Sequence, residues 1–322
     1  MDVQQRAIAC FKGLSTGDAI GKQTENLTRS DVLHWYPEGI RGFAGAPGQI
    51  IPRYVLNSKH QWRIGETTDD TEQTIAVSRA ILKDRRVTHL SVGQELLVCC
   101  KSVHSGVQSM WTFKQTGDPN RIATDGDGCG AAMRVAPVGI LYSSHRFDDL
   151  IKAAYEASIP THGGQLALAA AAAVAFAVSV ALDGGSANEV LTSSVRAAKM
   201  AEKRRPSQGA VTMSSAIQDV HDNLSCLTTL DADVLALQHF PDKPETKVPL
   251  AIALAVITKS AEETILLAAN IGGDADSVAS IGGAIAGALD PSTVNEDWFD
   301  VVDSINNEEL PRVASSVAAL RS

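Results

Sequence analysis

Aromatic residues and positive charge are both scarce in this chain of 322 residues. It has 4 Trp, 4 Tyr and 7 Phe, and its 28 Lys and Arg face 37 Asp and Glu, so the formal net charge is −9. The strands of a β-sandwich or barrel would need Val, Ile, Thr and Tyr, so few aromatics with many Ala and Gly favour close-packed helices. Nucleic-acid affinity comes largely from Lys and Arg that neutralise phosphates. We therefore exclude a nucleic-acid polymer as partner.

Sequence signals for export, for disulfide bonds and for a zinc site are also missing. A signal peptide has a basic region, then a long apolar run, then a cleavage site with small residues. The N-terminal stretch MDVQQRAIACFKGL does not show this order. The cysteines are odd in number and form no CxxC pair, which predicts reduced thiols in a cytoplasmic protein and neither disulfides nor a zinc site. They are Cys10, Cys99, Cys100, Cys129 and Cys226.

One apolar run, Leu166–Leu182, invites comparison with a membrane span. Its sequence LALAAAAAVAFAVSVAL is mostly Ala, and it is slightly shorter than the roughly 20 residues that cross a bilayer. A helix that is apolar on every side is typical of the buried centre of a helical domain. We expect a central buried Ala-rich helix and no membrane partner.

Helical periodicity dominates the rest of the chain, and alternation of period two is hardly visible. We therefore predict an all-α fold, a compact orthogonal helical bundle forming a single domain over 1–322. Breaks are expected at Gln115–Gly130 and Thr228–Thr246, and Arg29–Glu66 is expected to be a long irregular excursion of functional importance. The predicted helices are Val3–Leu14, Thr71–Leu82, Val87–Ser102, Phe147–Ser158, Gly164–Leu182, Ala187–Lys203, Met213–Asp222, Val248–Lys259, Ala261–Ala269 and Val278–Leu289.

Two clusters of carboxylates stand where apolar helices are expected to begin. The first is Thr67-Thr68-Asp69-Asp70-Thr71-Glu72, and the second is Asn270-Ile271-Gly272-Gly273-Asp274-Ala275-Asp276-Ser277. Capping of a helix N-terminus accounts for one carboxylate in each cluster. It accounts poorly for two, because neighbouring like charges repel unless a cation lies between them. Oxygen ligands from Asp, Ser and Thr suit Mg²⁺ or Mn²⁺, so together the clusters favour a metal site over caps.

Three shorter segments add to this pattern. Gly17 and Gly21 are four residues apart in GDAIGKQTE, which allows close helix packing just before Glu25. That segment is not a phosphate-binding P-loop, because its spacing is too short. The glycines of DGDGCGAAMR (125–134) let backbone N–H groups approach a ligand closely. His162 precedes the Ala-rich helix, where a histidine is more often structural than ligand-binding.

Taken in order, these segments resemble the ADP-ribosylglycohydrolase family, which includes dinitrogenase-reductase-activating glycohydrolases and ADP-ribosyl-acceptor hydrolases. The resemblance runs from the first predicted helix almost to the last. It implies an all-α fold with two Mg²⁺ or Mn²⁺ ions that cleaves the C1 glycosidic bond of an ADP-ribosyl adduct. The matching pieces are GDAIGKQTE (17–25), TTDDT (67–71), GCGAAMRVAP (128–137), TH (161–162) and NIGGDADSVASIGGAIAGAL (270–289).

The resemblance also implies roles for individual residues. The implied metal ligands are Thr68, Asp69, Asp70, Asp274, Asp276, which would bridge both ions, and Ser277. The implied catalytic carboxylates are Glu25, Asp70 and Asp276, with Glu25 guarding the site. The implied ligand channel comprises Gly128, Cys129, Gly130, Ala131, Met133, His162, Gly272 and Gly273.

The chain departs from the family pattern at three places, which leaves the substrate open. Cys129 and Ser277 stand where the family commonly has Asn and Thr, and Gly163-Gly164 replaces a second histidine. An N-glycosidase of nucleosides or other small ribosides is therefore an alternative to an ADP-ribosyl hydrolase. A third possibility is a non-catalytic relative that binds ADP-ribose, although this chain retains every acidic ligand.

Acceptor specificity depends on the irregular excursion and on the loop at 103–127. In that loop, Asp125 and Asp127 could meet a guanidinium group of the acceptor. Loop carboxylates are usually exposed, so we expect both side chains to be solvated.

Overall fold

The computed structural model of the chain describes residues 2–56, 60–102, 122–204 and 211–322. Across these ranges the fold is built from helices, and an isolated bridge between Ile50 and Arg63 is the only β pairing. The all-α prediction is confirmed. The helices are α1 (Val3–Gly21), α2 (Arg29–Trp35), η1 (Pro52–Tyr54), α3 (Asp69–Asp84), α4 (His89–Leu96), α7 (Gly130–Met133), α8 (Ala136–Leu141), α9 (Phe147–Ser158), α10 (Gln165–Leu182), α11 (Ala187–Arg204), α12 (Met213–Ser225), α13 (Ala232–His239), α14 (Pro244–Thr258), α15 (Ala261–Ile271), α16 (Ala275–Leu289), η2 (Pro291–Thr293), α17 (Glu296–Asn306) and α18 (Leu310–Ala318).

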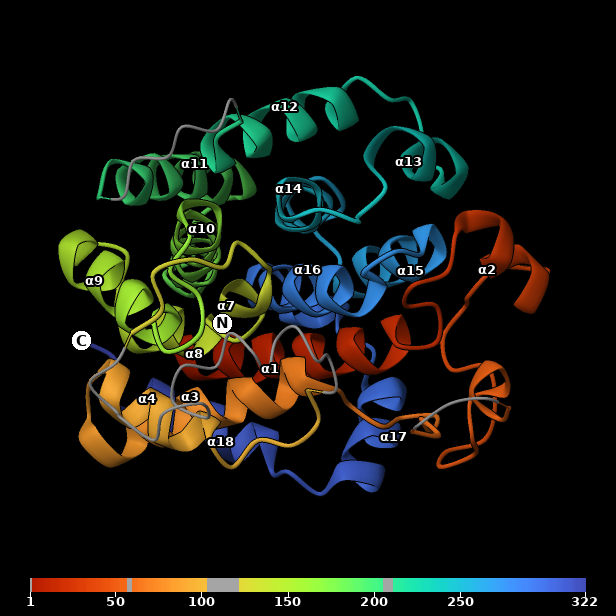
Figure 1. Ribbon diagram of the computed structural model, residues 1–322, viewed down its shortest axis with the longest axis horizontal. Helices are drawn as coiled ribbons and strands as arrows, with labels where there is room; N and C mark the ends of the chain where they lie inside the picture. Colours follow the sequence, from red (N-terminus) through yellow and green to blue (C-terminus); the bar gives the residue numbers. More distant parts are fainter. Residues whose placement is uncertain (1, 57–59, 103–121, 205–210) are drawn as a thin grey trace.

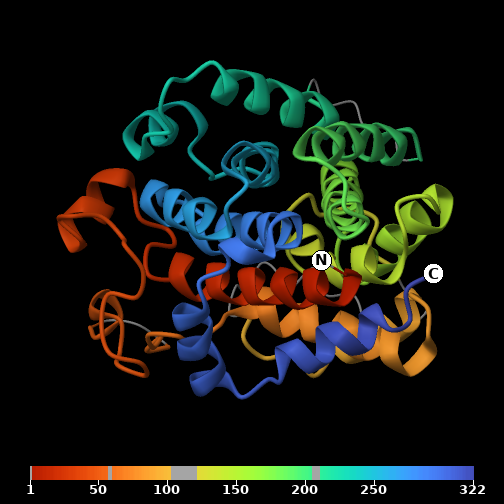
Figure 2. The same cartoon turned by 180° about the vertical axis from the view of Figure 1, so that it is seen from behind.

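The helices cross in layers, with α1 in the middle (Figure 1). In that view α10 and α14 are seen nearly end-on, whereas α1, α3 and α18 lie across the picture, so the bundle is orthogonal. From behind, α18 lies against α1 on the side opposite α16 (Figure 2). Every face of α1 beyond its first turns is therefore covered, which agrees with the burial of almost all its residues from Cys10 to Gly21.

Glycines bring α1 and α16 into backbone contact. A Cβ atom added to Gly17 would lie 2.2 Å from the carbonyl oxygen of Ala279, and one added to Gly21 would lie 2.4 Å from that of Ala275. Such distances are far below van der Waals contact, so only glycine fits at these positions. The predicted close packing through Gly17 and Gly21 is confirmed, and it fixes α16 against the end of α1.

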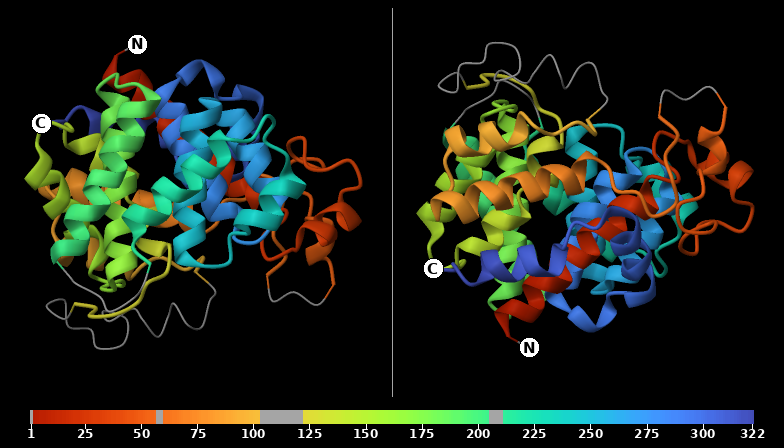
Figure 3. Two further views of the ribbon diagram at one scale, coloured as in Figure 1. Left: turned by 90° about the horizontal axis from the view of Figure 1, so that it is seen from above. Right: turned by 90° about the horizontal axis from the view of Figure 1, so that it is seen from below.

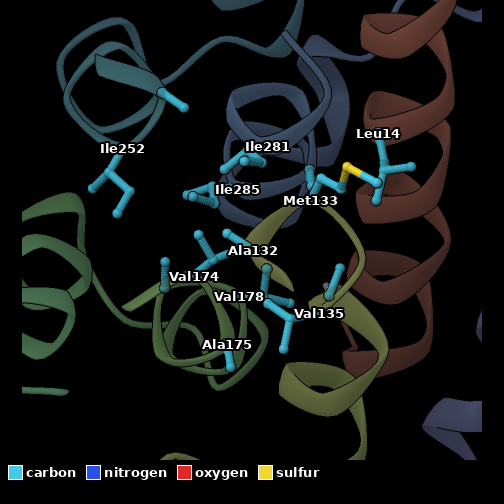
Figure 4. Packing of buried hydrophobic residues seen from close by; sticks show 14 of the residues in the cluster. Leu14, Ala132, Met133, Val135, Val174, Ala175, Val178, Ile252, Ile281 and Ile285 are labelled. Atoms are coloured by element: carbon cyan, nitrogen blue, oxygen red, sulfur yellow. The ribbon is translucent and has the colours of Figure 1, made fainter. Parts of the chain in front are cut away.

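The Ala-rich helix α10 forms the predicted buried centre. It is long and apolar enough to cross a membrane by length and composition, but 89% of it is buried inside the fold. Alanine favours helix and leaves room for close neighbours. Figure 4 shows Val174 and Val178 of α10 packed against Ala132 and Val135, with Ile281 of α16 close by.

Some predicted boundaries were wrong. The helix expected over Val87–Ser102 ends at Leu96, because Glu72 of α3 accepts hydrogen bonds from the backbone N–H groups of Cys100 and Lys101, both at 2.9 Å. The expected break at Thr228–Thr246 contains α13. The short helices α2, α7, α8, α17 and α18 were not predicted from the sequence.

In the described parts of the Arg29–Glu66 excursion, residues 29–56 and 60–66, the chain is irregular apart from α2 and η1. It projects from one side of the bundle (Figure 3) and carries its own small apolar cluster of Ile51, Trp62 and Ile64. Arg53 ties it to the end of α1 by donating to the carbonyl oxygens of Gln23 at 2.9 Å and Glu25 at 2.7 Å. The excursion therefore supports the turn that presents Glu25.

Candidate active site

A cavity of ≈ 550 Å³ lies where α3, α7, α16 and the end of α1 meet. Thirteen of the residues singled out from the sequence line it: Glu25, Asp69, Asp70, Asp127, Gly128, Cys129, Gly130, Met133, His162, Gly273, Asp274, Asp276 and Ser277. A second cavity of ≈ 500 Å³, beside α15 and η2, contains neither carboxylate cluster. The carboxylates, the glycine loop and the histidine thus meet in one place, although they are up to 250 residues apart in sequence.

Asp18 positions the first carboxylate cluster. Its buried carboxylate accepts hydrogen bonds from the backbone N–H of Thr68 at 2.9 Å, the N–H of Thr71 at 3.1 Å and the Thr71 hydroxyl at 2.6 Å. This fixes the start of α3 to α1 and turns Asp69 and Asp70 toward the cavity. The sequence did not indicate this role of Asp18, because the segment that contains it is typical of close helix packing.

A glycine pair positions the second cluster. Gly272 and Gly273 have φ values of +85° and +65°, which side chains other than glycine rarely adopt. The N–H of Gly273 donates to the carbonyl oxygen of Leu27 at 2.8 Å, and the N–H of Asp274 donates to that of Pro241 at 3.0 Å. This sharp turn from α15 into α16 sets Asp274 and Asp276 at the cavity.

Capping does not account for the four aspartates. Thr68 is the N-cap of α3, and its hydroxyl accepts from the N–H of Asp70 at 3.3 Å. Asp274 holds the N-cap position of α16 but makes no capping hydrogen bond.

Three of the predicted site residues do not line the cavity: Thr68 is the cap of α3, Ala131 is in the core, and Gly272 packs on Leu27.

A buried lysine joins Glu25 to the second cluster. Lys22 Nζ is ion-paired with Glu25, lies 3.6 Å from Asp276 Oδ2 and is 4.4 Å from the centroid of the Trp62 ring. Burial alone would lower the pKa of Lys22, but the charges of Asp276 and Glu25 together keep it above its ordinary value. Glu25 is therefore held beside Asp276 by a cation that belongs to the chain.

A second lysine pairs with Asp274. Lys247 of α14 lies 2.6 Å from Asp274 Oδ2, and the Cys129 thiol donates to the same oxygen at 3.2 Å. Burial favours the neutral form of Asp274, but the ion pair with Lys247 outweighs it and holds the pKa below its ordinary value. Burial and the charge of Asp274 raise the pKa of Cys129, which keeps the thiol protonated.

The other three aspartates have raised pKa values. Burial, followed by the charge of Asp18, raises the pKa of Asp69 to about 6 and that of Asp70 well above its ordinary value. Burial and the charge of Glu25 raise the pKa of Asp276. Crowded carboxylates of this kind are typical of functional sites, since the fold gains nothing by assembling them.

The donor set fits a hard divalent cation. Among the residues that the structure describes, no three His, Cys, Asp or Glu side chains are already arranged around one point as metal ligands. Asp70 Oδ1, however, is buried without a hydrogen-bond partner, and a lone buried carboxylate oxygen is unfavourable unless a cation or donor meets it. Lys22 and Lys247 now neutralise part of the cluster, so an entering ion would compete with their ammonium groups.

The glycine loop packs directly against His162 at the cavity wall. A Cβ atom added to Gly130 would lie 3.1 Å from His162 Nε2, and one added to Gly128 would lie 3.3 Å from it. Asp127 is exposed as expected, and its Oδ1 also accepts from the N–H groups of Leu166 at 2.8 Å and Ala167 at 3.3 Å. Asp127 thus caps α10, and Asp125 is exposed as expected.

Several lining residues had no sequence signal. Gln73 follows Asp69 by one helical turn, and Lys247 lies in an apolar helix far from Asp274 in sequence. The segment before α14 supplies an apolar wall, and its only signal was the break at Thr228–Thr246. The lining residues not singled out beforehand are Asn26, Thr28, Gln73, Phe240, Pro241, Asp242 and Lys247. Most of the predicted 103–127 loop, residues 103–121, lies outside the described residues.

The carboxylate cluster should destabilise the metal-free fold. Because the folded pKa of Asp70 is raised, ionisation opposes folding as the pH rises above the usual carboxyl range. Asp70→Asn should raise the thermal midpoint of chelator-treated protein at pH 7 by about 2–4 °C. Differential scanning calorimetry measures this shift, with Asp125→Asn, at an exposed loop carboxylate, as the control. A lower midpoint for Asp70→Asn would contradict the account.

His162 should make folding stability depend on pH. Burial, followed by the charge of Arg134, lowers the pKa of His162 to about 3. Below pH ~6.5 the His162 ring binds a proton in the unfolded chain but stays neutral in the folded chain. The free energy of unfolding therefore falls by about 2 kcal/mol between pH 6.5 and 5. Urea unfolding should show this loss in the parent protein and less of it in His162→Gln. His145→Gln, at an exposed histidine, should follow the parent; equal slopes for all three would refute the assignment.

Comparison with known proteins agrees with the geometry. The family model for ADP-ribosylglycohydrolase matches residues 1–322. An uncharacterised protein of Archaeoglobus fulgidus is 30% identical over 90% of this chain and 89% of its own length. The mouse ADP-ribosylhydrolase ARH3 is 24% identical over 90% of this chain and 85% of its own length.

A solved structure has the same fold. It is described as an ADP-ribosylglycohydrolase-related protein complex, and it aligns with a TM-score of 0.71 and 23% identity over 100% of this chain and 99% of its own. The family match over the full length of the chain establishes the relationship. The chain belongs to the ADP-ribosylglycohydrolase family.

Proposed function

We propose that the chain is a divalent-metal-dependent hydrolase that cleaves the C1 glycosidic bond of an ADP-ribosyl adduct on a protein side chain or a small molecule. The observation that carries this proposal is the convergence of Asp69, Asp70, Asp274 and Asp276 with Glu25 on one cavity of ≈ 550 Å³. Membership of the family supports the class of reaction, and a mouse relative is named an ADP-ribosylhydrolase.

The residues that would hold two Mg²⁺ or Mn²⁺ ions are Asp69, Asp70, Asp274, Asp276 and Ser277, which line the cavity, whereas Thr68 caps α3 outside the lining. Bound ions of this kind orient hydroxyl groups and make a nucleophile of water near neutral pH. The unpartnered oxygen of Asp70 and the hydroxyl of Ser277 both belong to this set. Their oxygen chemistry, rather than any ion seen in place, supports the assignment.

The chain's own residues supply the remainder of the chemistry. Cleavage of a glycoside passes through an oxocarbenium-like state, which nearby carboxylates stabilise. Asp276 and Glu25 provide that negative charge, and Lys22 holds the two acids together. Phe240 and Pro241 form an apolar wall suited to a flat ring, while His162 and the glycine loop face the cavity from another side.

A second candidate is an N-glycosidase of small ribosides. Cys129 favours it, because its thiol donates to Asp274 and presents no amide group to a ligand. Asp127 favours it as well, since it occupies the N-terminal N–H groups of α10 that could otherwise meet a phosphate. Both features reduce the number of donors available to a pyrophosphate.

A substrate panel separates the two candidates. Protein supplied with Mg²⁺ or Mn²⁺ is incubated with ADP-ribosyl-arginine, ADP-ribosyl-serine, O-acetyl-ADP-ribose and free nucleosides, and the products are resolved by chromatography. We expect free ADP-ribose from at least one adduct and no base release from nucleosides. Base release without cleavage of any adduct would overturn the proposal in favour of the second candidate.

A further inference from the structure

A buried arginine beside the cavity donates to groups on two sides. Arg134 follows α7 and is fully buried. Its Nη1 donates to Gln73 Oε1 at 2.8 Å, and its Nη2 donates to the Thr161 hydroxyl at 2.7 Å and to the carbonyl oxygen of Ala157 at 3.0 Å. A guanidinium group has donors only, so the direction of each of these hydrogen bonds is fixed.

The hydrogen bonds of Arg134 fix the direction of the next hydrogen bonds on both sides. Since Gln73 Oε1 accepts from Arg134, the other end of the amide donates, and Gln73 Nε2 lies 3.2 Å from Asp69 Oδ2. On the opposite side, Thr161 Oγ1 lies 2.7 Å from His162 Nδ1. The Thr161 oxygen already accepts from Arg134, and its own proton needs an acceptor because a buried hydroxyl without one is unfavourable.

Among the described residues, His162 Nδ1 is the acceptor within reach of that proton. An Nδ1–H group would instead leave the hydroxyl proton unpaired and point a positive dipole toward the guanidinium. Burial and Arg134 also lower the pKa of His162 to about 3, so the ring is neutral at pH 7. A neutral imidazole that accepts at Nδ1 carries its proton on Nε2.

The Nε2 edge of the ring lies toward the cavity wall formed by the glycine loop. His162 lines the cavity, and its Nε2 would be 3.1 Å from a Cβ atom on Gly130 and 3.3 Å from one on Gly128. The glycines leave the imidazole room to approach the loop backbone. A ligand group seated against this loop therefore meets the N–H of a neutral ring.

We propose that Arg134 and Thr161 are positioning residues that fix His162 as the Nε2–H tautomer, so that the ring donates to an acceptor oxygen of the ligand beside Gly128 and Gly130. The tautomer follows from the protein's own hydrogen bonds. The identity of the ligand oxygen, in an ADP-ribosyl group, rests on the proposed function. The same chain of hydrogen bonds ends at Asp69, so one buried cation orients both a candidate metal ligand and a ligand-binding ring.

Nitrogen-15 spectra of the full chain test the tautomer directly. Histidine-labelled protein at pH 7 should show a His162 ring with a protonated Nε2 and an unprotonated Nδ1, assigned by its absence from His162→Gln. Thr161→Val should mix the two tautomers, and Thr161→Ser should restore the parent pattern. A proton on Nδ1 in the parent protein, or an unchanged pattern in Thr161→Val, would overturn the proposal.

Titration with ADP-ribose tests the consequence for binding. Thr161→Val should bind ADP-ribose about 3- to 10-fold more weakly than the parent, since roughly one neutral hydrogen bond loses its pre-set geometry, and Thr161→Ser should bind like the parent. Equal affinity for Thr161→Val and the parent would overturn the role in binding. If the parent binds no ADP-ribose, the proposed function fails, while the spectra still decide the tautomer.

Discussion

Replacing Asp276 by alanine should abolish turnover and the thermal stabilisation that Mg²⁺ or Mn²⁺ gives to the parent protein. Asp276 is buried, lies 3.6 Å from Lys22 Nζ and accepts from the N–H of Ser277 at 3.0 Å. In the proposed site it would be one of the residues that hold the ions. A metal ion contributes several kcal/mol to transition-state stabilisation, so the rate should fall by about 10³-fold or more.

The fold should survive this substitution. Lys22 keeps its ion pair with Glu25 and its place over Trp62, so the change leaves no uncompensated buried cation. The rate of ADP-ribose release and the metal-induced shift in thermal midpoint are measured on Asp276→Ala, the parent protein and Asp125→Ala. The last variant removes an exposed carboxylate outside the cluster and should behave as the parent. Full activity in Asp276→Ala would refute the assignment of the site.

Replacing Gly17 by alanine should destabilise the whole fold. The added methyl carbon would lie 2.2 Å from the carbonyl oxygen and 2.5 Å from the carbonyl carbon of Ala279, which are backbone atoms of a buried helix. Neither atom can turn aside as a side chain can, so α1 and α16 must separate. Overpacking of this kind costs about 3 kcal/mol or more, and α16 carries Asp276 one turn from the contact.

Urea unfolding of Gly17→Ala and the parent protein measures this loss. Gly45→Ala is the matched control, because its added carbon would meet the flexible end of Gln49 at 3.0 Å and no backbone atom. We expect the control to stay within about 0.5 kcal/mol of the parent, as surface substitutions usually do. A Gly17→Ala variant as stable as the control would show that the contact between α1 and α16 is not tight.

Much of the fold follows from local pattern. The predicted range Phe147–Ser158 coincides with α9, and the long apolar run lies in α10, because strong periodicity and a high content of Ala both favour helix over a segment of this length. The spacing of Gly17 and Gly21 predicted close helix packing, and the structure shows that the partner is α16. The four residues of α7 are too few for a period to be recognised. The helix α18 was missed although Leu310, Ala314 and Val317 form an apolar stripe at helical spacing.

Part of the candidate site could likewise be predicted from the sequence, and part could not. The aspartate clusters were found because adjacent carboxylates at a helix start have no packing purpose. Lys22 and Lys247 were not found as their partners, since an ion pair between Lys247 and Asp274 depends on how α14 packs beside α16. Arg134 gave no signal either, because nothing in its local sequence shows that its guanidinium is buried between Gln73 and Thr161.

The central claim is that this site cleaves an ADP-ribosyl bond with the help of a divalent ion. Its most direct test is the rate at which chelator-treated protein releases ADP-ribose from ADP-ribosyl-arginine, ADP-ribosyl-serine and O-acetyl-ADP-ribose as Mg²⁺ or Mn²⁺ is added back. The account predicts no release without metal and saturable release from at least one adduct as the ion is restored. Release that is unaffected by chelation, or none from any adduct at any metal concentration, would contradict it.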